Sequence, residues 1–423
     1  MVSNLQLGHP FPPTLMNTLP SAIADKPELD TIPGDSETCN HETPESMKDL
    51  LNEFTSTSSK IPWHRDIIDG LHQGRGVPKV SGIFVGDACQ HKCSFCSTAN
   101  RGNAALTLHQ VETYVDQLIP LGLKAVILSG GGNPILWKDR EKGYDFNDLV
   151  DTLHGKDLQI GLISNGLKNM VQYPDGRTSW RTVRPETLDK LTWIRISLSA
   201  WDHGEEVEVP DINPDLTALG GSWVYHDSYK DPLDRHGKVS RPEDLQTPLL
   251  PGEEADRVTY GKDRLPFIKQ KLKELLSTKP FTYIRALPNC YEIQKIPERC
   301  IELEQMALEV DPRIMVQYKP PAPHTCCLLG YSHPVLWPSG DVTPCDSVTL
   351  LDQANRSQGG SAYVIGRWDT IHELYEQPVR SLIDPMVHCQ KCVFGTQNRA
   401  LDAIWKGADP QPSGPEPRHK NFI

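Results

Sequence analysis

Short apolar runs alternate with stretches of helical periodicity, and this alternation constrains the fold more than any other feature of the chain. We predict buried strands at Val80–Val85, Ala125–Leu128, Ile160–Ile163, Ile194–Leu198, Tyr283–Leu287 and Ile314–Tyr318. Helical spacing occupies Leu108–Ile119, Asn147–Leu153, Arg264–Leu276 and Ile293–Val310. Strands joined by helical crossovers pair in parallel. The sequence therefore predicts an α/β fold whose parallel sheet is wound into a full or partial barrel.

The segments around this alternation divide the chain into further parts. Residues 1–75 read as a mobile N-terminal arm or cap, with a short helix that starts at Thr43–Pro44 and runs through Phe54. The barrel core spans 76–320 and is interrupted at 201–262 by an acidic, turn-rich insertion typical of a lid. A second cysteine-bearing part follows at 321–400. Residues 401–423 are predicted to be disordered because they are rich in Pro and Gly.

The charge and the apolar runs limit where the chain works. It carries 43 Lys and Arg against 55 Asp and Glu, a net charge of −12 at pH 7, which argues against a protein that coats nucleic acid. No run approaches the ~20 apolar residues needed to cross a bilayer. The N-terminus also lacks the basic and apolar regions of a secretion signal. We therefore expect a cytoplasmic protein without a membrane partner, whose 11 cysteines are reduced and in several cases bind metal.

Cys89, Cys93 and Cys96 follow the first predicted strand with the spacing C-x3-C-x2-C. Three thiolates on one loop can bind three irons of a four-iron cluster and leave the fourth iron open. The alternative is a structural zinc knuckle with His91 or a distant group as the fourth ligand. Zinc sites more often pair two C-x2-C units and fill all four positions. The position after a barrel strand, where such folds have their active sites, also favours the iron–sulfur cluster.

These motifs resemble those of the radical S-adenosylmethionine (radical SAM) enzymes, in which an aromatic residue precedes the third cysteine, here Phe95. The resemblance covers about residues 78–320. It implies a partial (β/α)6 barrel of the TIM type. It also implies that a [4Fe–4S] cluster on Cys89, Cys93 and Cys96 binds SAM.

The same resemblance implies which residues contact SAM. The segment from Ser129 to Pro134 is similar to the family's GGEP-type turn, although Asn133 replaces an acidic residue and leaves that contact to backbone carbonyls. By itself, a glycine run after a strand is equally typical of a tight turn. Ser164-Asn165-Gly166 resembles the turn that follows the third strand in this family. Arg195–Ser199 resembles the segment that forms the fourth strand. The implied SAM contacts are Phe95, Gly130, Gly131, Gly132, Asn133, Asn165, Arg195, Ser197 and Ser199.

Four more cysteines, Cys327, Cys345, Cys389 and Cys392, lie in the C-terminal part. Their spacing alone permits a fully ligated iron–sulfur cluster or an all-thiolate zinc site. The hairpin before Cys345 and the C-x2-C pair resemble the twitch domain, a shortened SPASM domain that binds an auxiliary cluster. That resemblance implies a second [4Fe–4S] cluster on these four thiols. Cys326 is the alternative to Cys327.

The resemblance implies an enzyme that cleaves SAM reductively to a 5′-deoxyadenosyl radical, which abstracts hydrogen from a substrate. Oxidation, epimerisation and rearrangement are all open outcomes, and no catalytic residue is assigned. An electron donor such as a flavodoxin or ferredoxin is implied as a partner. We expect a small polar substrate, with a peptide or a (hyper)modified nucleobase in nucleic acid as alternatives. His203 and His226 are the best substrate contacts because they fall in the predicted lid. The alternative of another class is a zinc-binding scaffold without catalysis.

Overall fold

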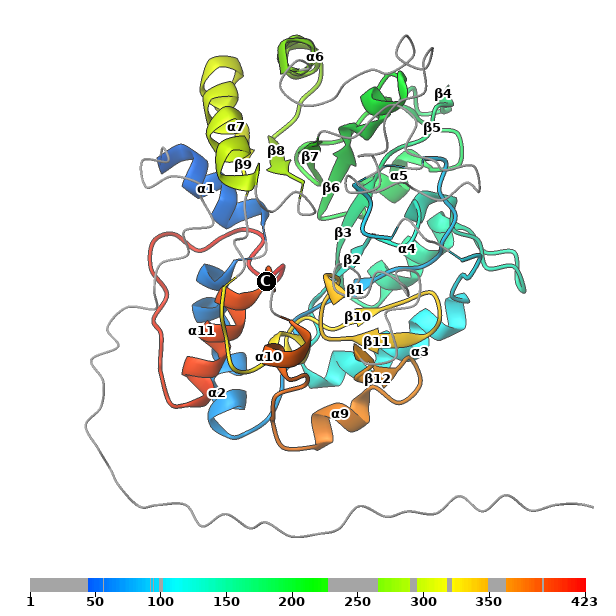
Figure 1. Ribbon diagram of the computed structural model, residues 1–423. Helices are drawn as coiled ribbons and strands as arrows, with labels where there is room; N and C mark the ends of the chain where they lie inside the picture. Colours follow the sequence, from blue (N-terminus) through cyan, green and yellow to red (C-terminus); the bar gives the residue numbers. More distant parts are fainter. Residues whose placement is uncertain are drawn as a thin grey trace, which may run out of the picture.

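The computed structural model describes residues 45–55, 57–91, 93, 95–98, 102–226, 265–289, 295–317, 322–348, 363–389 and 392–423. Its main element is a curved sheet with the strand order β12-β11-β10-β1-β2-β3-β6-β7-β8-β9. All neighbours from β10 to β9 pair in parallel, and β11 and β12 add antiparallel strands. In the described part of the chain β9 and β12 are the two edges, so the sheet curves without closing (Figure 1). The prediction of an α/β fold with a partial barrel is confirmed.

The strands of this sheet are short. They are β1 (Val80–Ile83), β2 (Ala125–Leu128), β3 (Gln159–Ser164), β6 (Trp193–Ser197), β7 (Ala218–Tyr225), β8 (Tyr283–Pro288), β9 (Ile314–Val316), β10 (Val335–Leu336), β11 (Asp341–Thr343) and β12 (Gly366–Arg367). Their residues are mostly buried. A parallel sheet covered on both faces requires such apolar strands.

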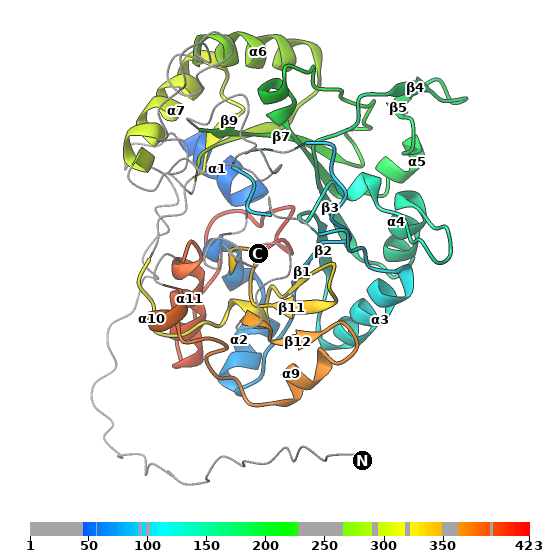
Figure 2. The same ribbon diagram turned by 45° about the vertical axis from the view of Figure 1, so that its right-hand side comes forward.

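Helices cover the outer face of the sheet, as Figure 2 shows. They are α3 (Leu108–Leu118), α4 (Phe146–Gly155), α5 (Pro185–Leu188), α6 (Leu265–Thr278) and α7 (Ile296–Val310). Helices α3 and α4 both begin at capping boxes, in which the side chains of Thr107 and Asp145 accept hydrogen bonds from backbone amides of the first turn. Local capping thus fixes where two of the predicted helices begin.

The predicted lid at 201–262 contains a strand of the barrel. Residues 218–225 form β7 between β6 and β8, so the six-strand prediction lacked one strand. Gly220 and Gly221 weaken the local strand signal. Gly220 is required there because a Cβ atom would lie 2.2 Å from Cζ of Tyr283 on β8. Residues 227–262 of the predicted lid lie outside the described residues.

The structure has further elements beside this sheet and its covering helices. They are α1 (Glu45–Phe54), η1 (Ser58–Trp63), α2 (Arg65–His72), η2 (Ile119–Leu121), η3 (Pro134–Leu136), η4 (Leu198–His203), η9 (Leu329–Tyr331), α9 (His372–Glu376), α10 (Pro385–His388), α11 (Gly395–Trp405) and the hairpin of β4 (Met170–Gln172) and β5 (Thr178–Trp180). Helix α1 matches the short helix predicted before Phe54. Among the described residues, no helix combines the length and apolar content needed to cross a membrane.

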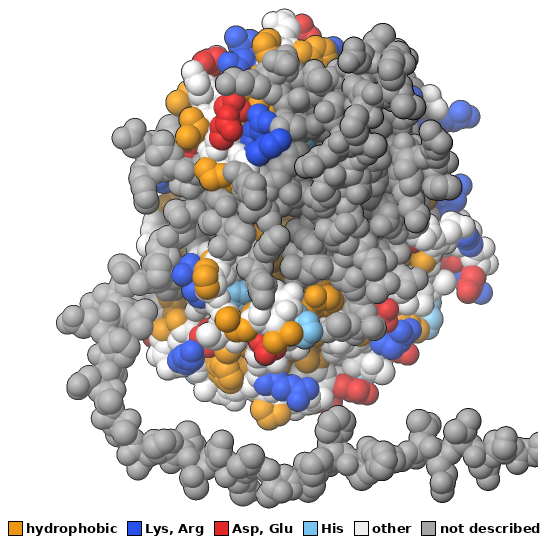
Figure 3. All heavy atoms as spheres, viewed as in Figure 1, with side chains coloured by type: hydrophobic (Ala, Val, Ile, Leu, Met, Phe, Trp, Pro, Cys, Tyr) orange, Lys and Arg blue, Asp and Glu red, His pale blue; other side chains and the backbone are white. Residues whose placement is uncertain are grey.

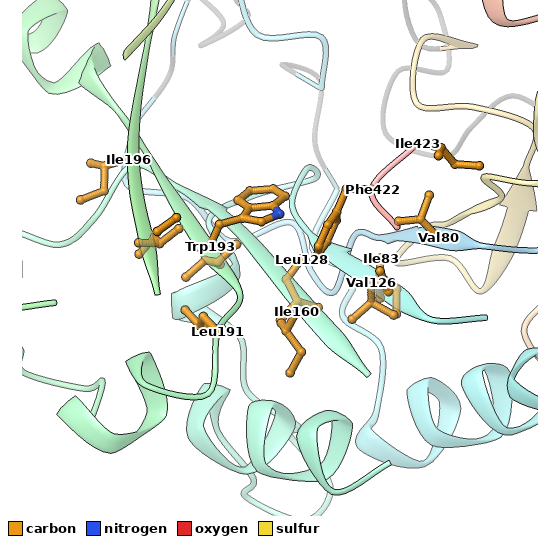
Figure 4. Packing of buried hydrophobic residues seen from close by; sticks show 14 of the residues in the cluster. Val80, Ile83, Val126, Leu128, Ile160, Leu191, Trp193, Ile196, Phe422 and Ile423 are labelled. Carbon is orange, nitrogen blue, oxygen red and sulfur yellow. The ribbon is translucent and has the colours of Figure 1, made fainter. Parts of the chain in front are cut away.

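The C-terminal segment 401–423 is ordered against the barrel, in contrast to the predicted disorder. Its first residues belong to α11. Phe422 and Ile423 are 4% and 3% exposed and lie inside the curve of the sheet, where the Phe422 ring contacts Trp193 of β6 at 5.2 Å between centroids (Figure 4). The composition of residues 407–418 suggested disorder, but two apolar residues at the very end bury themselves in the barrel interior.

A buried lysine joins this C-terminal segment to the N-terminal helix. The Lys60 side chain is fully buried and its Nζ donates to the backbone oxygens of Glu53, His419 and Phe422 at 3.0, 3.2 and 3.2 Å. Three acceptors match the three donors of an ammonium group, which compensates the cost of burying it. The Glu53 carboxylate accepts hydrogen bonds from the backbone amides of Arg418 and His419, both at 2.9 Å.

We predict that docking of the C-terminal segment makes stability pH-dependent through His64. Burial lowers the pKa of His64 from 6.5 to about 4, and its Nε2 lies 2.9 Å from the backbone oxygen of Lys420. The unfolded chain therefore binds a proton near pH 6.5 that the folded chain excludes down to about pH 4. The free energy of unfolding, measured in urea, should therefore fall by up to about 3 kcal/mol as the pH is lowered from 6.5 to about 4.

A His64→Gln variant is the control for this prediction, because glutamine keeps a donor without titrating. Its free energy of unfolding should fall less over the same pH range than that of the unaltered chain. Equal slopes for the two proteins would contradict the prediction.

Candidate functional site

The loop with Cys89, Cys93 and Cys96 follows β1 at the carboxyl edge of the sheet, and all three are half-buried free thiols. The predicted glycine turn follows β2, and Asn165 follows β3 at the same edge. Parallel pairing brings these three connections together, since the carboxyl ends of neighbouring parallel strands lie side by side.

The glycine turn holds the segment that leads into Cys89. The amide of Gly132 donates to the carbonyl of Gly86, and the amide of Asn133 to that of Ala88, both at 2.7 Å. A Cβ atom at Gly132 would lie 2.0 Å from the Ala88 oxygen, and Gly131 adopts a positive φ of 59°. The glycines therefore allow a backbone-to-backbone approach that other residues would prevent.

The side chain of Asn133 is buried and joins the three loops to one another. Its Nδ2 donates to Oε1 of Gln90 and to the carbonyl of Gly166, at 3.1 and 2.9 Å. Its Oδ1 accepts from Ser164 at 2.7 Å. These hydrogen bonds occupy both polar atoms of the Asn133 side chain, so Asn133 would contact a ligand through its backbone.

Each of the three thiols has a polar neighbour. Nδ2 of Asn165 lies 3.7 Å from Sγ of Cys89. Nε2 of His203 lies 3.4 Å from Sγ of Cys93, and Oγ1 of Thr98 lies 3.3 Å from Sγ of Cys96. Polar groups around sulfur ligands stabilise the thiolate and tune the potential of an iron–sulfur cluster.

Cys93 is in a surrounding that disfavours a free thiolate. Burial raises the pKa of its thiol well above the usual value, and the nearby Cys96, Asp202 and Cys89 add to this effect. A buried thiolate of this kind needs the positive charge of a metal for its stability. The loop is therefore better suited to a metal centre than to a nucleophilic cysteine.

His91 and His203 form a second possible set of metal ligands with Cys93. One ligand atom from each of the three lies within 4.8 Å of the others, and the two rings stack with centroids 4.5 Å apart. His91 is also held by Asn165 and by Glu205, at 2.8 and 3.1 Å. His203, predicted as a substrate contact, thus lies beside the cysteine loop.

The other predicted contacts divide between the loop and the barrel interior. Ser199 hydrogen-bonds Cys93 and accepts from Ser197 at 3.1 Å, which places both serines at the loop. The ring of Phe95 lies 4.8 Å from that of His226. Arg195 instead faces the barrel interior, where its side chain donates to the hydroxyl of Tyr283.

A cavity of about 390 Å³ occupies the barrel interior below the cysteine loop. Phe95 and Ser97 of the loop line it on one side. The far wall includes Phe422 of the C-terminal segment and Phe54 of α1. Arg285, Glu53, Lys60 and His419 also line it, and sequence reasoning missed all four. Alternate residues of β8 face the barrel interior, and this pattern could have indicated Arg285. The other three residues reach the cavity only through long-range packing.

The second set of cysteines also comes together. Cys327 and Cys389 belong to one buried cluster with Phe84 and Trp337, and Cys345 and Cys392 pack against it. Burial and the neighbouring thiols raise the pKa of Cys327 and Cys345 well above the usual value. Burial, followed by Cys392, raises that of Cys389 to about 12.

The spacing of these four thiols bears on the kind of metal centre. Within the described residues, no three of them present sulfur atoms all within 4.8 Å of one another. Ligands of a single tetrahedral zinc, with Zn–S bonds of about 2.3 Å, lie about 3.8 Å apart. The described thiols thus do not present the compact set of sulfur ligands that a single zinc ion requires.

Cys326 and Cys327 occupy different environments. Burial, followed by the charge of Asp402 on α11, raises the pKa of Cys326, and Asp402 also hydrogen-bonds this thiol. Cys327 shares its neighbours with Cys389 and Cys392. The structure therefore brings Cys327, rather than its neighbour, into the group of four. Cys300 on α7 is disulfide-bonded, which departs from the expectation that the cysteines are reduced.

On the described part of the face seen in Figure 3, Lys and Arg side chains are interspersed with Asp and Glu.

Comparison with known proteins identifies the part that carries the cysteine loop. Residues 83–201 match the Radical SAM superfamily. A search of curated proteins found no match. The fold was also compared with solved structures. Streptococcus suis SuiB bound to precursor peptide SuiA is 13% identical, with a TM-score of 0.40 over 74% of this chain and 69% of that chain.

Two further solved structures have similarly low scores. BtrN in complex with AdoMet and 2-DOIA is 10% identical, with a TM-score of 0.31 over 80% of this chain and 93% of that chain. The protein anSMEcpe with bound AdoMet and Cp18Cys peptide is 11% identical, with a TM-score of 0.39 over 70% and 80%.

We predict that Gly132→Ala displaces the cysteine loop. The added methyl group would overlap the Ala88 backbone, and such overpacking costs about 1–3 kcal/mol. Iron bound after anaerobic reconstitution and the midpoint of thermal unfolding should both fall. Gly155→Ala is the control, since a Cβ there meets no atom within 4 Å; equal iron content in the two variants would contradict the prediction.

Proposed function

We propose that this chain, which carries a radical SAM domain at residues 83–201, is a radical SAM enzyme that acts on a small polar molecule. One observation carries the proposal: the cysteine loop after β1 is hydrogen-bonded to the glycine turn after β2, and the same loop lines a cavity. Cluster, SAM and substrate would then occupy adjacent places at the carboxyl edge of the sheet.

The residues of the loop fit a [4Fe–4S] cluster. Cys89, Cys93 and Cys96 would ligate three irons and leave the fourth for SAM. Asn165 and Thr98 lie beside two of the sulfur atoms. When bound, this cluster supplies the electron that cleaves SAM to methionine and a 5′-deoxyadenosyl radical, which abstracts hydrogen from the substrate.

The protein's own part is to bind and orient SAM. Backbone groups of Gly130–Asn133 would receive the methionine moiety, and Ser197 and Ser199 would contact SAM from the end of β6. Phe95 lines the cavity at the side of the loop and would separate cluster from substrate. Apolar walls of the cavity exclude water that would otherwise quench a reactive intermediate.

The size of the cavity supports a small substrate. A volume of about 390 Å³ is in the range of sites for small molecules. Oxidation, epimerisation and rearrangement all begin with the same hydrogen abstraction. The enzyme would draw its electrons from a flavodoxin or a ferredoxin.

Cys327, Cys345, Cys389 and Cys392 would bind an auxiliary [4Fe–4S] cluster of the twitch or SPASM type. All four gather at one buried cluster, which supports this assignment. Strand β10 adjoins β1, and Cys345 lies next to Asp346, which lines the cavity. An auxiliary cluster so close to the cavity is suited to accepting an electron from a substrate radical or to shaping the pocket.

The first test measures iron and acid-labile sulfide after anaerobic reconstitution. We expect about eight irons per unaltered chain and about four in the Cys89, Cys93 and Cys96 triple alanine variant. The unaltered chain should form 5′-deoxyadenosine from SAM under reductant, and the variant should form none. A colourless protein that binds one or two zinc ions and leaves SAM intact would instead support the scaffold alternative.

A second test separates the two clusters. Cys389→Ala should lose about four irons but retain some SAM cleavage that is uncoupled from product formation. Cys326→Ala is the matched control and should keep the full iron content, because its thiol faces α11. Iron loss from Cys326→Ala, with none from Cys389→Ala, would reverse the ligand assignment.

A further inference from the structure

Two arginine side chains face the cavity from neighbouring layers of the barrel. Arg195 lies on β6 in register with Gly220 of β7 and Tyr283 of β8. In the next layer, Ser197 and Ser222 are in register with Arg285 of β8. Side chains two residues apart on a strand lie on the same face, so both layers face the interior, and both arginines line the cavity.

Arg195 is held by uncharged groups. Its Nε donates to the hydroxyl of Tyr283 at 3.1 Å and its Nη2 to the backbone oxygen of Phe54 at 2.7 Å. Its guanidinium lies 5.1 Å from the centre of the Trp193 ring. The side chain is only 5% exposed. These contacts orient the guanidinium without neutralising its charge.

Arg285 is likewise bonded to a neutral partner. Its Nη1 donates to Oε1 of Gln317 at 2.7 Å. Its Nε, and Nε2 of Gln317, are buried without a hydrogen-bond partner. Gln317 is 5% exposed. Unsatisfied buried donors are rare in folded proteins, and here two of them lie at the same wall of the cavity.

The acidic groups of the cavity do not pair with these arginines. Among the described residues, no carboxylate oxygen lies within 4 Å of a nitrogen of Arg195 or Arg285. Glu53 is bound to His419, with 2.7 Å between Oε1 and Nδ1. Asp346 is exposed and acts on Arg285 only through its charge.

The two guanidinium groups also affect each other. Burial, followed by the charge of Arg195, lowers the pKa of Arg285 to about 9. An anion between the two guanidinium groups would relieve this repulsion and accept hydrogen bonds from the buried donors that lack a partner.

We propose that the cavity binds its substrate through an anionic oxygen group, a carboxylate or a phosphate, placed between Arg195 and Arg285. This inference rests on the proposed function and names the class of its substrate. The planar donor fork of arginine matches the oxygens of both groups. Arg195, assigned to SAM from the sequence, would then serve the substrate, while Ser197 and Ser199 remain near the cysteine loop.

Isothermal titration of the reconstituted full chain tests this proposal with three probes in low-salt buffer. The probes are inorganic phosphate, glutarate and its uncharged analogue glutaramide. We expect saturable binding of at least one anion, and the preferred anion identifies the group. No saturable binding of either anion up to about 50 mM, or equal binding of glutarate and glutaramide, would overturn the proposal.

Variants locate the binding site. Arg285→Met and Arg195→Met should each raise the dissociation constant of the bound anion at least about tenfold, since each removes a charge-assisted contact. Arg285→Lys, which keeps the charge but loses the fork, should recover part of the affinity and guards against a folding defect in the methionine variant. Arg367→Met is the control, because Arg367 is half exposed on β12 and pairs with Asp341.

Unchanged affinity in Arg285→Met and Arg195→Met would place the anion elsewhere and overturn the proposal. SAM cleavage by the unaltered chain is measured separately. Its absence would reject the proposed function, whereas anion binding by the same sample is read independently of that outcome.

Discussion

The open curvature of the sheet is the constraint on which the rest of the structure depends. A parallel sheet that does not close leaves an apolar interior without a wall on one side, and that side must be covered by other parts of the chain. Helix α1 and the last residues of the chain cover it. The buried ammonium of Lys60 joins these two segments by binding backbone oxygens from both. Contacts between α1 and the C-terminal segment thus cover part of the barrel interior.

The residues that line the cavity decide its electrostatic character. The Trp193 ring lies beside the Arg195 guanidinium, and most of the cavity lining is apolar, so charges there are less screened than in bulk water. The acidic residue from α1, Glu53, is occupied by the C-terminal segment. The net charge of −12 therefore says little about this site, where unpaired positive charge prevails locally.

The cysteine loop depends on a different principle, the close approach of two backbones. Gly132 and Ala88 come together only because a glycine stands at the turn, and the amides there are used to hold the loop. The side chain of Asn133 adds bonds to the third loop. Three consecutive connections of the sheet thereby form one rigid support, which a site for a metal cluster and its ligand requires.

Local patterns in the sequence were sufficient for the alternation of strands and helices. The strand prediction missed β7, where Gly220 weakens the local pattern. Glycine is required there because of the Tyr283 ring, which is more than sixty residues away in the chain. Composition likewise predicted a disordered C-terminal segment. That prediction failed because the site that buries Phe422 exists only once the barrel has formed. Local composition does not encode such partners.

The sequence by itself determined the cysteine spacing, the glycine turn and the parallel order that brings them to one edge, because each depends on neighbours along the chain or on regular strand pairing. Only the tertiary structure decided that Cys327 rather than Cys326 joins the second group of thiols. It also decided that Arg195 and Arg285 line the same cavity. The direction of a side chain relative to distant residues follows from packing, and packing is a property of the folded chain as a whole.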